Sequence, residues 1–273
     1  MTKIIIRPKS AWKLVDLREI WRYRELLYIF AWRDIKVRYK QTILGILWVI
    51  FQPIMTTFIF TFFFGNLAKI QSGGLPYSLF SLSGLIFWLF FSGSLQHASD
   101  SMVVNESIIK KVYFPKILLP LSSVITGLVD FSINLFLLLV YALMICYFPR
   151  LIGLIILPFC LLLTSVTAVG LGLFLSSFNV KYRDVRYILP FFIQLLLFLT
   201  PVIYPLGIVS EKNRMIMALN PMSSVVELSR SVFSESYGLF PELLLISIVS
   251  SFIILFFGLA YFRKTERFFA DIV

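Results

Sequence analysis

Charged residues are scarce in this sequence. Lys, Arg, Asp and Glu together make up 14% of its 273 residues, against roughly 25% in an ordinary soluble domain. Hydrophobic residues make up 59%, which is more apolar surface than a soluble protein of this size can keep from water. A disordered chain is also excluded, because disorder requires few aromatic residues and much charge, whereas 17% of this chain is aromatic. The composition therefore predicts a protein that crosses a membrane several times.

Cysteine and histidine are nearly absent. The two cysteines, Cys146 and Cys160, lie in apolar stretches and exclude a disulfide scaffold. The one histidine, His97, has no second histidine and no Cys–Glu group near it, which favours a structural role over a metal site. None of the 13 glycines precedes a lysine, so a phosphate-binding P-loop is missing. We therefore predict that this chain holds no metal or cofactor and does not hydrolyse ATP alone.

Long apolar stretches are what the sequence has instead. Six of them, at about 44–67, 77–96, 117–147, 152–178, 188–206 and 241–262, approach or exceed the ~20 residues that a spanning helix needs. We predict an all-α integral membrane protein with an N-terminal region (1–43), a six-helix transmembrane domain (44–262) and a tail (263–273). Both termini then share one side. If that side is the cytoplasm, inner segments hold most Lys and Arg residues, which indicates this orientation.

The N-terminal region is strongly basic, and we expect it to face anionic lipid headgroups rather than nucleic acid. One helical face carries Tyr28, Ala31, Trp32, Ile35 and Tyr39, and the other carries Arg33, Asp34, Lys36, Arg38 and Lys40. The pattern predicts an amphipathic helix in the membrane interface, with Tyr28, Trp32, Arg33, Lys36, Arg38 and Tyr39 at its lipid contacts. A cytosolic helix packed on a partner protein is the alternative.

Residues 105–115, between the second and third stretches, predict a short cytoplasmic helix. Asn105 can cap its start, and Pro115 ends it after roughly two turns. Its lysines and aromatic residues suit docking to a soluble partner.

The segment 207–240 carries too many charges to cross lipid as one helix. Residues 215–219 and 225–233 are nevertheless apolar enough to enter the membrane, and Asn220–Pro221 separates them. We predict two external re-entrant half-helices that would suit a gate, because such helices need protein or water around their ends. An ordinary folded external loop is the alternative.

Asp130 is the one acid deep within a predicted span, where a charge costs about 2.5–3.5 kcal/mol on insertion scales. One interpretation is a polar point on a substrate path, with Asn134 one turn away. The other is an Asp that hydrogen-bonds to a neighbouring helix.

A different pattern, with Thr164, Ala168, Gly172 and Ser176 spaced four residues apart, predicts a face for close helix packing.

Several motifs keep a familiar order along nearly the whole chain. They are residues 32–39 leading into 44–48 and Pro53, the inner loop with Asn105, Lys110, Lys111, Phe114 and Pro115, residues 182–185 and 200–205, Asn220–Pro221, and the final Phe268, Ala270 and Asp271. In these motifs the sequence resembles the permease subunit of type-two ABC exporters, most closely the Wzm-like permeases that export lipid-linked O-antigen polysaccharide.

The resemblance implies a homodimer around one channel in the bacterial inner membrane. It also implies two cytosolic ABC ATPase subunits, which would bind ATP and Mg²⁺, and a lipid-linked polysaccharide as substrate. The ATPase would receive a coupling helix made of Ser107, Ile108, Ile109, Lys110, Lys111, Val112, Tyr113 and Phe114. The sequence patterns and the resemblance together give six candidate residues for the channel or gate: Asp130, Trp88, Phe91, Tyr204, Asn220 and Pro221. Aromatic rings such as Trp88 and Phe91 would offer contact to sugar C–H faces, or would simply pack in the core.

The sequence alone also allows other functions. Within the family, export of capsular polysaccharide, teichoic acid or drugs is the alternative. A membrane transferase acting on a lipid-linked sugar is a more remote one, since it needs paired acids or a His–acid pair near one face. Asp100, Glu106 and His97 are the residues that would supply it.

Overall fold

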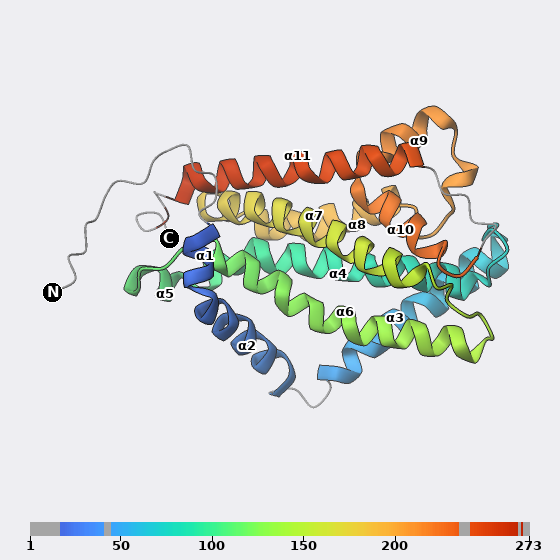
Figure 1. Cartoon of the computed structure of the whole chain (residues 1–273), viewed down its shortest axis with the longest axis horizontal. Helices are drawn as coiled ribbons and strands as arrows, with labels where there is room; N and C mark the ends of the chain where they lie inside the picture. The colour runs from blue at the N-terminus through green and yellow to red at the C-terminus, as the bar shows by residue number, and fades with distance from the viewer. Residues whose placement is uncertain (1–16, 41–44, 235–240, 267–268, 270–273) are drawn as a thin grey trace.

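The computed structural model describes residues 17–40, 45–234, 241–266 and 269, and these ranges form a bundle of helices with no β-strand (Figure 1). The helices are α1 (Leu17–Arg22), α2 (Arg24–Lys40), α3 (Gly45–Phe60), the π-helix η1 (Thr61–Leu67), α4 (Tyr77–Val104), α5 (Glu106–Lys111), α6 (Leu118–Met144), α7 (Gly153–Lys181), α8 (Val185–Leu199), the 3₁₀ turn η2 (Leu206–Ile208), α9 (Glu211–Ala218), α10 (Pro221–Arg230) and α11 (Pro241–Glu266). The first 16 residues, the end of the predicted external segment and most of the predicted tail, including Phe268, Ala270 and Asp271, lie outside the described residues.

Five helical stretches in the described ranges are long and apolar enough to cross a membrane: Gly45–Leu67, Tyr77–Val104, Leu118–Met144, Gly153–Lys181 and Pro241–Glu266. They correspond to five of the six predicted spans. The predicted span 188–206 is wrong in its bounds, because α8 has 15 residues and ends at Leu199. Thr200 adopts an extended backbone, as expected for a residue before a proline. A crossing by α8, and with it the six-span topology, stays a prediction.

Helix α4 lies at the centre of the bundle and packs against α6, α7 and α10. The stripe of small residues on α7 faces it. Thr164, Ala168 and Ser176 are fully buried, and a Cβ atom on Gly172 would lie 2.7 Å from the Cβ of Ala98 on α4. The prediction that this stripe is a packing face is confirmed, since only small side chains let the two backbones approach so closely.

Helix α7 also meets α11 through a pair of glycines that the sequence reading did not single out. A Cβ atom on Gly258 of α11 would lie 2.0 Å from the carbonyl oxygen of Gly170, and one on Gly170 would lie 2.7 Å from the Cα of Leu255. The two backbones are therefore in direct contact. Thr167 and Ser251 hydrogen-bond across the same contact, with their hydroxyl oxygens 3.1 Å apart.

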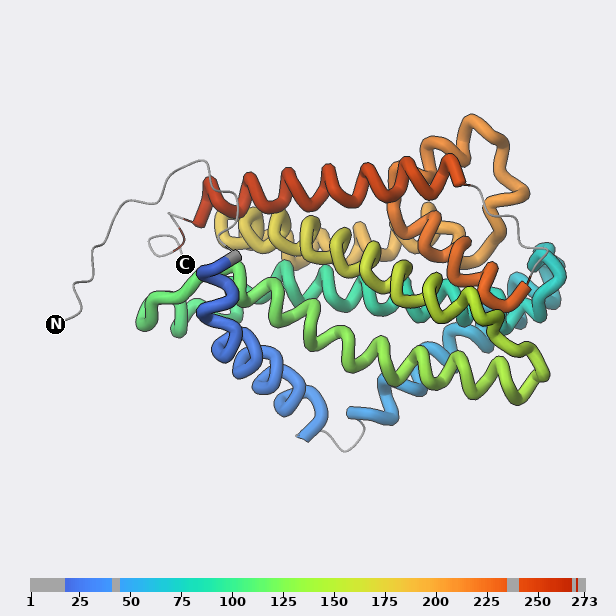
Figure 2. Tube along the Cα trace, in the orientation of Figure 1, coloured from blue at the N-terminus to red at the C-terminus, as the bar shows by residue number. Residues whose placement is uncertain are grey.

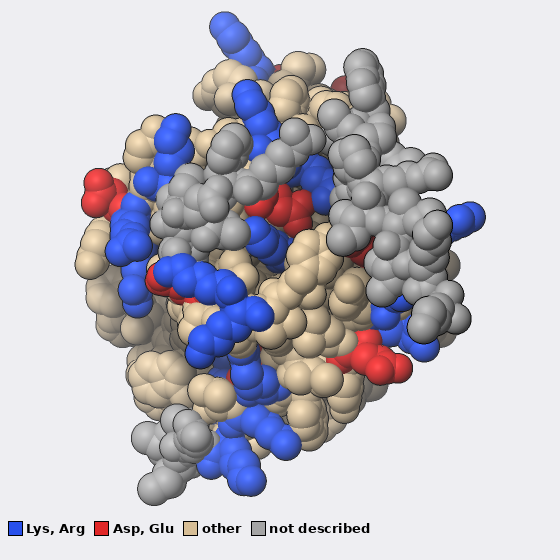
Figure 3. All heavy atoms as spheres, turned by 90° about the vertical axis from the view of Figure 1, so that its left-hand side faces the viewer, with Lys and Arg blue, Asp and Glu red and all other residues tan. Residues whose placement is uncertain are grey.

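The bundle has two distinct ends. One carries α1, α5 and the end of α11, and the other carries η1, α9 and α10 (Figures 1 and 2). Figure 3 looks onto the first end and shows that Lys and Arg side chains gather on its surface. We call this first end the basic end. The distribution agrees with the charge pattern in the sequence, and the placement of the basic end in the cytoplasm stays a prediction.

Candidate functional site

Helix α2 is tied to the middle of α6 through Asp130. Arg38 and Tyr39 both donate hydrogen bonds to the Asp130 carboxylate, one to each oxygen. Arg38 and Tyr39 were predicted on opposite faces of the helix, and this is wrong, because both side chains meet at one carboxylate, which Arg38 neutralises within the bundle. Burial and the bond to Asp130 raise the pKa of the Tyr39 phenol above its ordinary value, so the phenol stays protonated and donates.

The outward side of α2 is aromatic. Tyr28 is 65% exposed and stacks on Trp32 with ring centroids 6.3 Å apart, and the Lys36 ammonium lies 5.4 Å from the Trp32 ring centroid. Arg33 instead pairs with its neighbour Asp34. Exposed aromatic rings with a lysine beside them are typical of a helix at a membrane surface, and the interface location stays a prediction.

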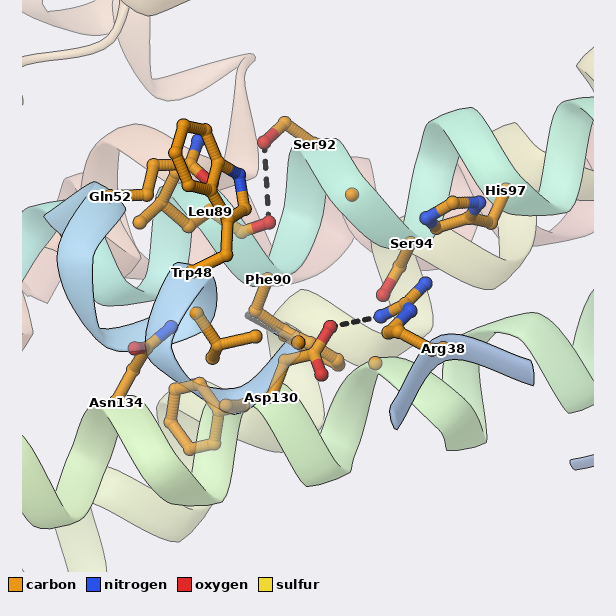
Figure 4. A pocket seen from close by; sticks show the side chains of 15 residues that line it. Arg38, Trp48, Gln52, Leu89, Phe90, Ser92, Ser94, His97, Asp130 and Asn134 are labelled. Atoms are coloured by element: carbon orange, nitrogen blue, oxygen red, sulfur yellow. Dashed lines mark hydrogen bonds and ion pairs between the residues drawn. The ribbon is translucent and has the colours of Figure 1, made fainter. Parts of the chain in front are cut away.

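Asp130 also borders a cavity of about 550 Å³ between α2, α3, α4 and α6 (Figure 4). We call it the Asp130 cavity. Its polar lining comes mainly from Arg38, Gln52, Ser94, His97, Asp130 and Asn134. The interpretation that Asp130 hydrogen-bonds to a neighbouring helix is therefore confirmed. A place on a substrate path stays a prediction. His97 belongs to the same lining, a position that its isolation in the sequence did not reveal.

Removal of this carboxylate should release α2. We expect Asp130→Ala to destabilise the α2–α6 contact by about 1–2 kcal/mol, between the values for exposed and buried ion pairs, since both side chains are about a quarter exposed. Limited proteolysis near residue 41 should then become faster. Ser132→Ala, at an exposed site two residues further along α6 and on its other side, is the control. An unchanged cleavage rate in Asp130→Ala would mean that this pair does not hold α2.

The predicted short helix 105–115 is wrong in its end, because α5 stops at Lys111 and Val112 adopts an extended backbone. We call residues 106–114 the coupling segment; its coupling role stays a prediction. Its residues divide into two groups. Val112 and Tyr113 are 57% and 75% exposed, and Ser107, Lys110 and Lys111 are also exposed. Ile108 is half-buried, whereas Ile109 and Phe114 are buried in the protein's own core. The last two therefore anchor the segment instead of projecting from it.

The start of α5 differs from the prediction. Asn105 holds the N-cap position, but its side chain makes no capping bond and donates to the carbonyl oxygen of Ser101 at the end of α4. The first turn is supported instead by Glu106, which accepts from Lys110 at 2.6 Å. That hydrogen bond lowers the pKa of the Glu106 carboxyl, which stays charged at neutral pH.

The anchors of the coupling segment belong to a hydrophobic group that we call the inner cluster. It consists of Phe30, Met102, Ile109, Phe114, Leu118, Leu119, Leu173, Val180, Phe262 and Phe269. Phe114 packs on Phe30 of α2 with ring centroids 5.4 Å apart. Lys116 donates to the backbone oxygen of Glu266 at 3.2 Å and lies over the Phe269 ring. The coupling segment, α2 and the end of α11 are thus one packed unit.

At the opposite end, α9 and α10 are two short helices separated by a break at Asn220–Pro221, as predicted. The Asn220 side chain accepts from the backbone N–H of Met222 and donates to the Thr200 hydroxyl, while Pro221 opens the helix. These two residues therefore have a definite structural role. Entry of the helices into the membrane stays a prediction.

Arg230 closes α10 and is fully buried, which the sequence did not indicate. Its guanidinium donates to Glu227 at 3.0 Å and to the carbonyl oxygens of Phe80 and Val202, and it lies 3.5 Å from the Phe80 ring centroid. Burial of a charge is tolerated only with such partners. This arrangement fixes α10 against α4.

Trp88 and Phe91, predicted to line a channel, lie in the core instead. They are 4% and 1% exposed and pack on each other, because α4 is surrounded by other helices. Tyr204 is partly buried, and its hydroxyl donates to the carbonyl oxygen of Phe198. It borders a second, more open hollow of about 540 Å³ beside α9.

The residues that a transferase would need are engaged separately. The two carboxylate oxygens of Asp100 accept from Gln96 and Asn179, whereas Glu106 pairs with Lys110 on the surface. Over the described ranges, no group of three His, Cys, Asp or Glu residues could hold a metal ion.

This helical, membrane-spanning architecture agrees with comparison to known sequences. The sequence model of the family "ABC-2 type transporter" matches residues 25–234. The chain belongs to this family of transporter proteins.

Three relatives with assigned names align along most of the chain. An "O-antigen export system permease protein RfbA" from Klebsiella pneumoniae is 29% identical over 91% of this chain and 95% of its own length. A protein of the same name from Myxococcus xanthus is 29% identical over 80% and 84%. The "Polysialic acid transport protein KpsM" of Escherichia coli is 25% identical over 86% and 91%.

Proposed function

We propose that this chain is the membrane subunit of an ATP-driven exporter of lipid-linked polysaccharide, of the O-antigen class, in a bacterial inner membrane. The observation that carries the proposal is the near full-length similarity to relatives named for polysaccharide transport. The O-antigen class is preferred because the relatives with that name are more similar than the polysialic acid transporter, 29% against 25% identity. Polysialic acid or another capsular polysaccharide is the second candidate.

The same proposal includes a homodimer with two cytosolic ABC ATPase subunits, which would supply ATP and Mg²⁺. The basic end would face the cytoplasm, and the ATPase would contact the exposed residues Lys110, Lys111, Val112 and Tyr113. Movement of this segment would be passed to α2 and α11 through the inner cluster, because closely packed groups shift together. Asp130 would extend the connection from α2 to α6.

The proposal is tested by purifying the chain with an ABC ATPase from the same organism and measuring ATP hydrolysis against added lipid-linked glycan. We expect glycan to stimulate hydrolysis, and we expect no hydrolysis from this chain alone. Glycosyl transfer by the chain without an ATPase would contradict the proposal and favour the transferase alternative.

The exposed and buried groups of the coupling segment should behave differently when changed. Replacement of Lys110, Lys111, Val112 and Tyr113 by alanine should abolish copurification with the ATPase and export, while the melting temperature stays near the wild-type value. Phe114→Ala should instead destabilise the protein by about 3–5 kcal/mol, the usual cost of truncating a buried Phe. Retained copurification in the fourfold variant would remove the docking role.

A further inference from the structure

Helix α8 packs only lightly on the rest of its subunit. Leu189 is the one buried residue among its 15, and the helix contacts mainly α4 and α7. Away from this contact, four exposed residues follow one another at steps of four, three and four: Tyr187, Phe191, Gln194 and Phe198. We call them the α8 stripe. Their spacing is that of the contact positions in a coiled coil.

The α8 stripe places an amide where lipid cannot satisfy it. By helical rise, Gln194 is about 13.5 Å from the first residue of α8 and about 7.5 Å from the last. Its side chain is exposed and makes no hydrogen bond to any residue that the structure describes. An amide without a hydrogen-bond partner is costly in hydrocarbon. In the crossing that we predict for α8, Gln194 therefore needs a polar partner from outside its subunit.

Helix α11 provides a comparison within the same protein. An exposed stripe on it has the same spacing and is apolar throughout: Leu245, Val249, Phe252 and Phe256. Lipid chains can cover such a stripe without leaving a polar group unsatisfied. Water does not suit the α8 stripe either, because Phe191 and Phe198 flank the amide within about one turn on each side. The α8 stripe thus requires an apolar partner with one group that can pair with an amide.

A second copy of α8 meets both requirements. Two copies in one membrane have the same orientation, so a twofold axis along the membrane normal brings a residue opposite itself at the same depth. An amide is self-complementary, because its N–H groups can donate to a second amide and its carbonyl oxygen can accept from it. A polar residue at one contact position also fixes the register of two paired helices.

We propose that α8 packs on α8 of a second copy of the chain, with the two Gln194 amides hydrogen-bonded to each other across the twofold axis. The inference rests on the homodimer of the proposed function and names its contact residues. It gives α8, which one subunit leaves almost uncovered, the packing partner that its polar stripe requires.

Cysteine crosslinking tests this contact. Gln194→Cys is made in a Cys146→Ser background, because Cys146 is exposed whereas Cys160 is buried. The full-length chain with its ATPase is placed in lipid nanodiscs, one complex per disc, and the covalent dimer formed with copper phenanthroline is measured on non-reducing gels. Matched controls are Phe192→Cys, exposed on another side of α8, and Phe252→Cys on the apolar stripe of α11. We expect Gln194→Cys to crosslink at least about tenfold faster than either control, since a disulfide requires Cα atoms within about 7 Å.

A second measurement tests the amide pair itself. Phe191→Cys reports on the same contact while Gln194 is intact, and it should also crosslink faster than the controls. Added Gln194→Leu should slow this crosslinking by about fivefold, because lipid covers an apolar stripe as well as a second copy does. Added Gln194→Asn keeps an amide and should retain most of the rate. If Gln194→Cys does not form the complex, Phe191→Cys and its two Gln194 variants decide alone.

Crosslinking of Gln194→Cys and Phe191→Cys no faster than that of the controls would overturn the contact. An unchanged Phe191→Cys rate in Gln194→Leu would overturn the amide pair. Rapid labelling of Gln194→Cys by a charged maleimide, without crosslinking, would show that the amide faces water instead of a second copy.

The outcome is separable from that of the proposed function. Glycan-stimulated ATP hydrolysis by the wild-type complex together with no crosslinking would overturn the α8 contact alone. Crosslinking without any glycan-stimulated hydrolysis would overturn the exporter function and leave the α8 contact in place.

Discussion

Arg230→Ala should lower the melting temperature of the purified protein by roughly 10 °C, because it removes one partner of a buried ion pair at a cost of about 3–5 kcal/mol. Glu227, at 6% exposure, would lose its partner and would either stay as an uncompensated buried charge or take up a proton, and both outcomes cost stability. The carbonyl oxygens of Phe80 and Val202 would also lose their donor. Thermal unfolding in detergent, followed by size-exclusion fluorescence, measures the effect.

Two further variants make the interpretation specific. Lys212→Ala removes an exposed cation from the neighbouring helix α9 and should leave the melting temperature unchanged. Arg230→Met combined with Glu227→Leu removes both charges and should recover most of the lost stability, since an apolar pair can replace a buried ion pair. If Arg230→Ala melts like the wild type, the buried pair does not hold α10 in place.

Gly258→Ala should separate α11 from α7. The new methyl group would lie 2.0 Å from the carbonyl oxygen of Gly170, and a backbone atom cannot move aside as a flexible side chain can. We expect destabilisation of about 3 kcal/mol, the upper end of the usual cost of overpacking. The direction of the stability change is informative, because replacing Gly by Ala within a helix otherwise stabilises a protein by about 1 kcal/mol. Melting temperature and the monodispersity of the purified protein provide the measurement.

Gly93→Ala is the matched control for this substitution. It is also a helical Gly-to-Ala change, but its methyl group meets no atom within 4 Å. It should therefore leave stability unchanged or raise it slightly. A stabilised Gly258→Ala would show that the α7–α11 contact is looser than the structure indicates.

The helices themselves could be predicted well from the sequence. The lengths of the hydrophobic stretches alone predicted the bounds of α4, α6, α7 and α11 to within a few residues at most ends. The four-residue spacing of small side chains on α7 predicted which face of this helix packs closely. Such features depend on local composition. The Gly170–Gly258 contact was missed because it joins two single glycines that are far apart in sequence and have no pattern around them.

The candidate site was less predictable for the same physical reason. Asp130 was found because an acid in an apolar run is rare, but its partner Arg38 was assigned to the opposite side of α2. Helical periodicity gives the angle of a side chain and does not show which neighbour it meets. Long side chains such as Arg230 reach partners from several elements, and an aromatic such as Trp88 packs in the core or lines a channel with the same sequence signal.

The shortness of α8 has a consequence for the surrounding lipid. Fifteen residues rise about 22 Å, less than the ~30 Å hydrocarbon thickness of a typical bilayer. The chain after Leu199 then turns into the buried segment 200–203 and the short helices α9 and α10. If α8 crosses the membrane, the bilayer thins beside it or a hydrated funnel descends to its end, and a departing polymer would meet water well below the outer headgroups.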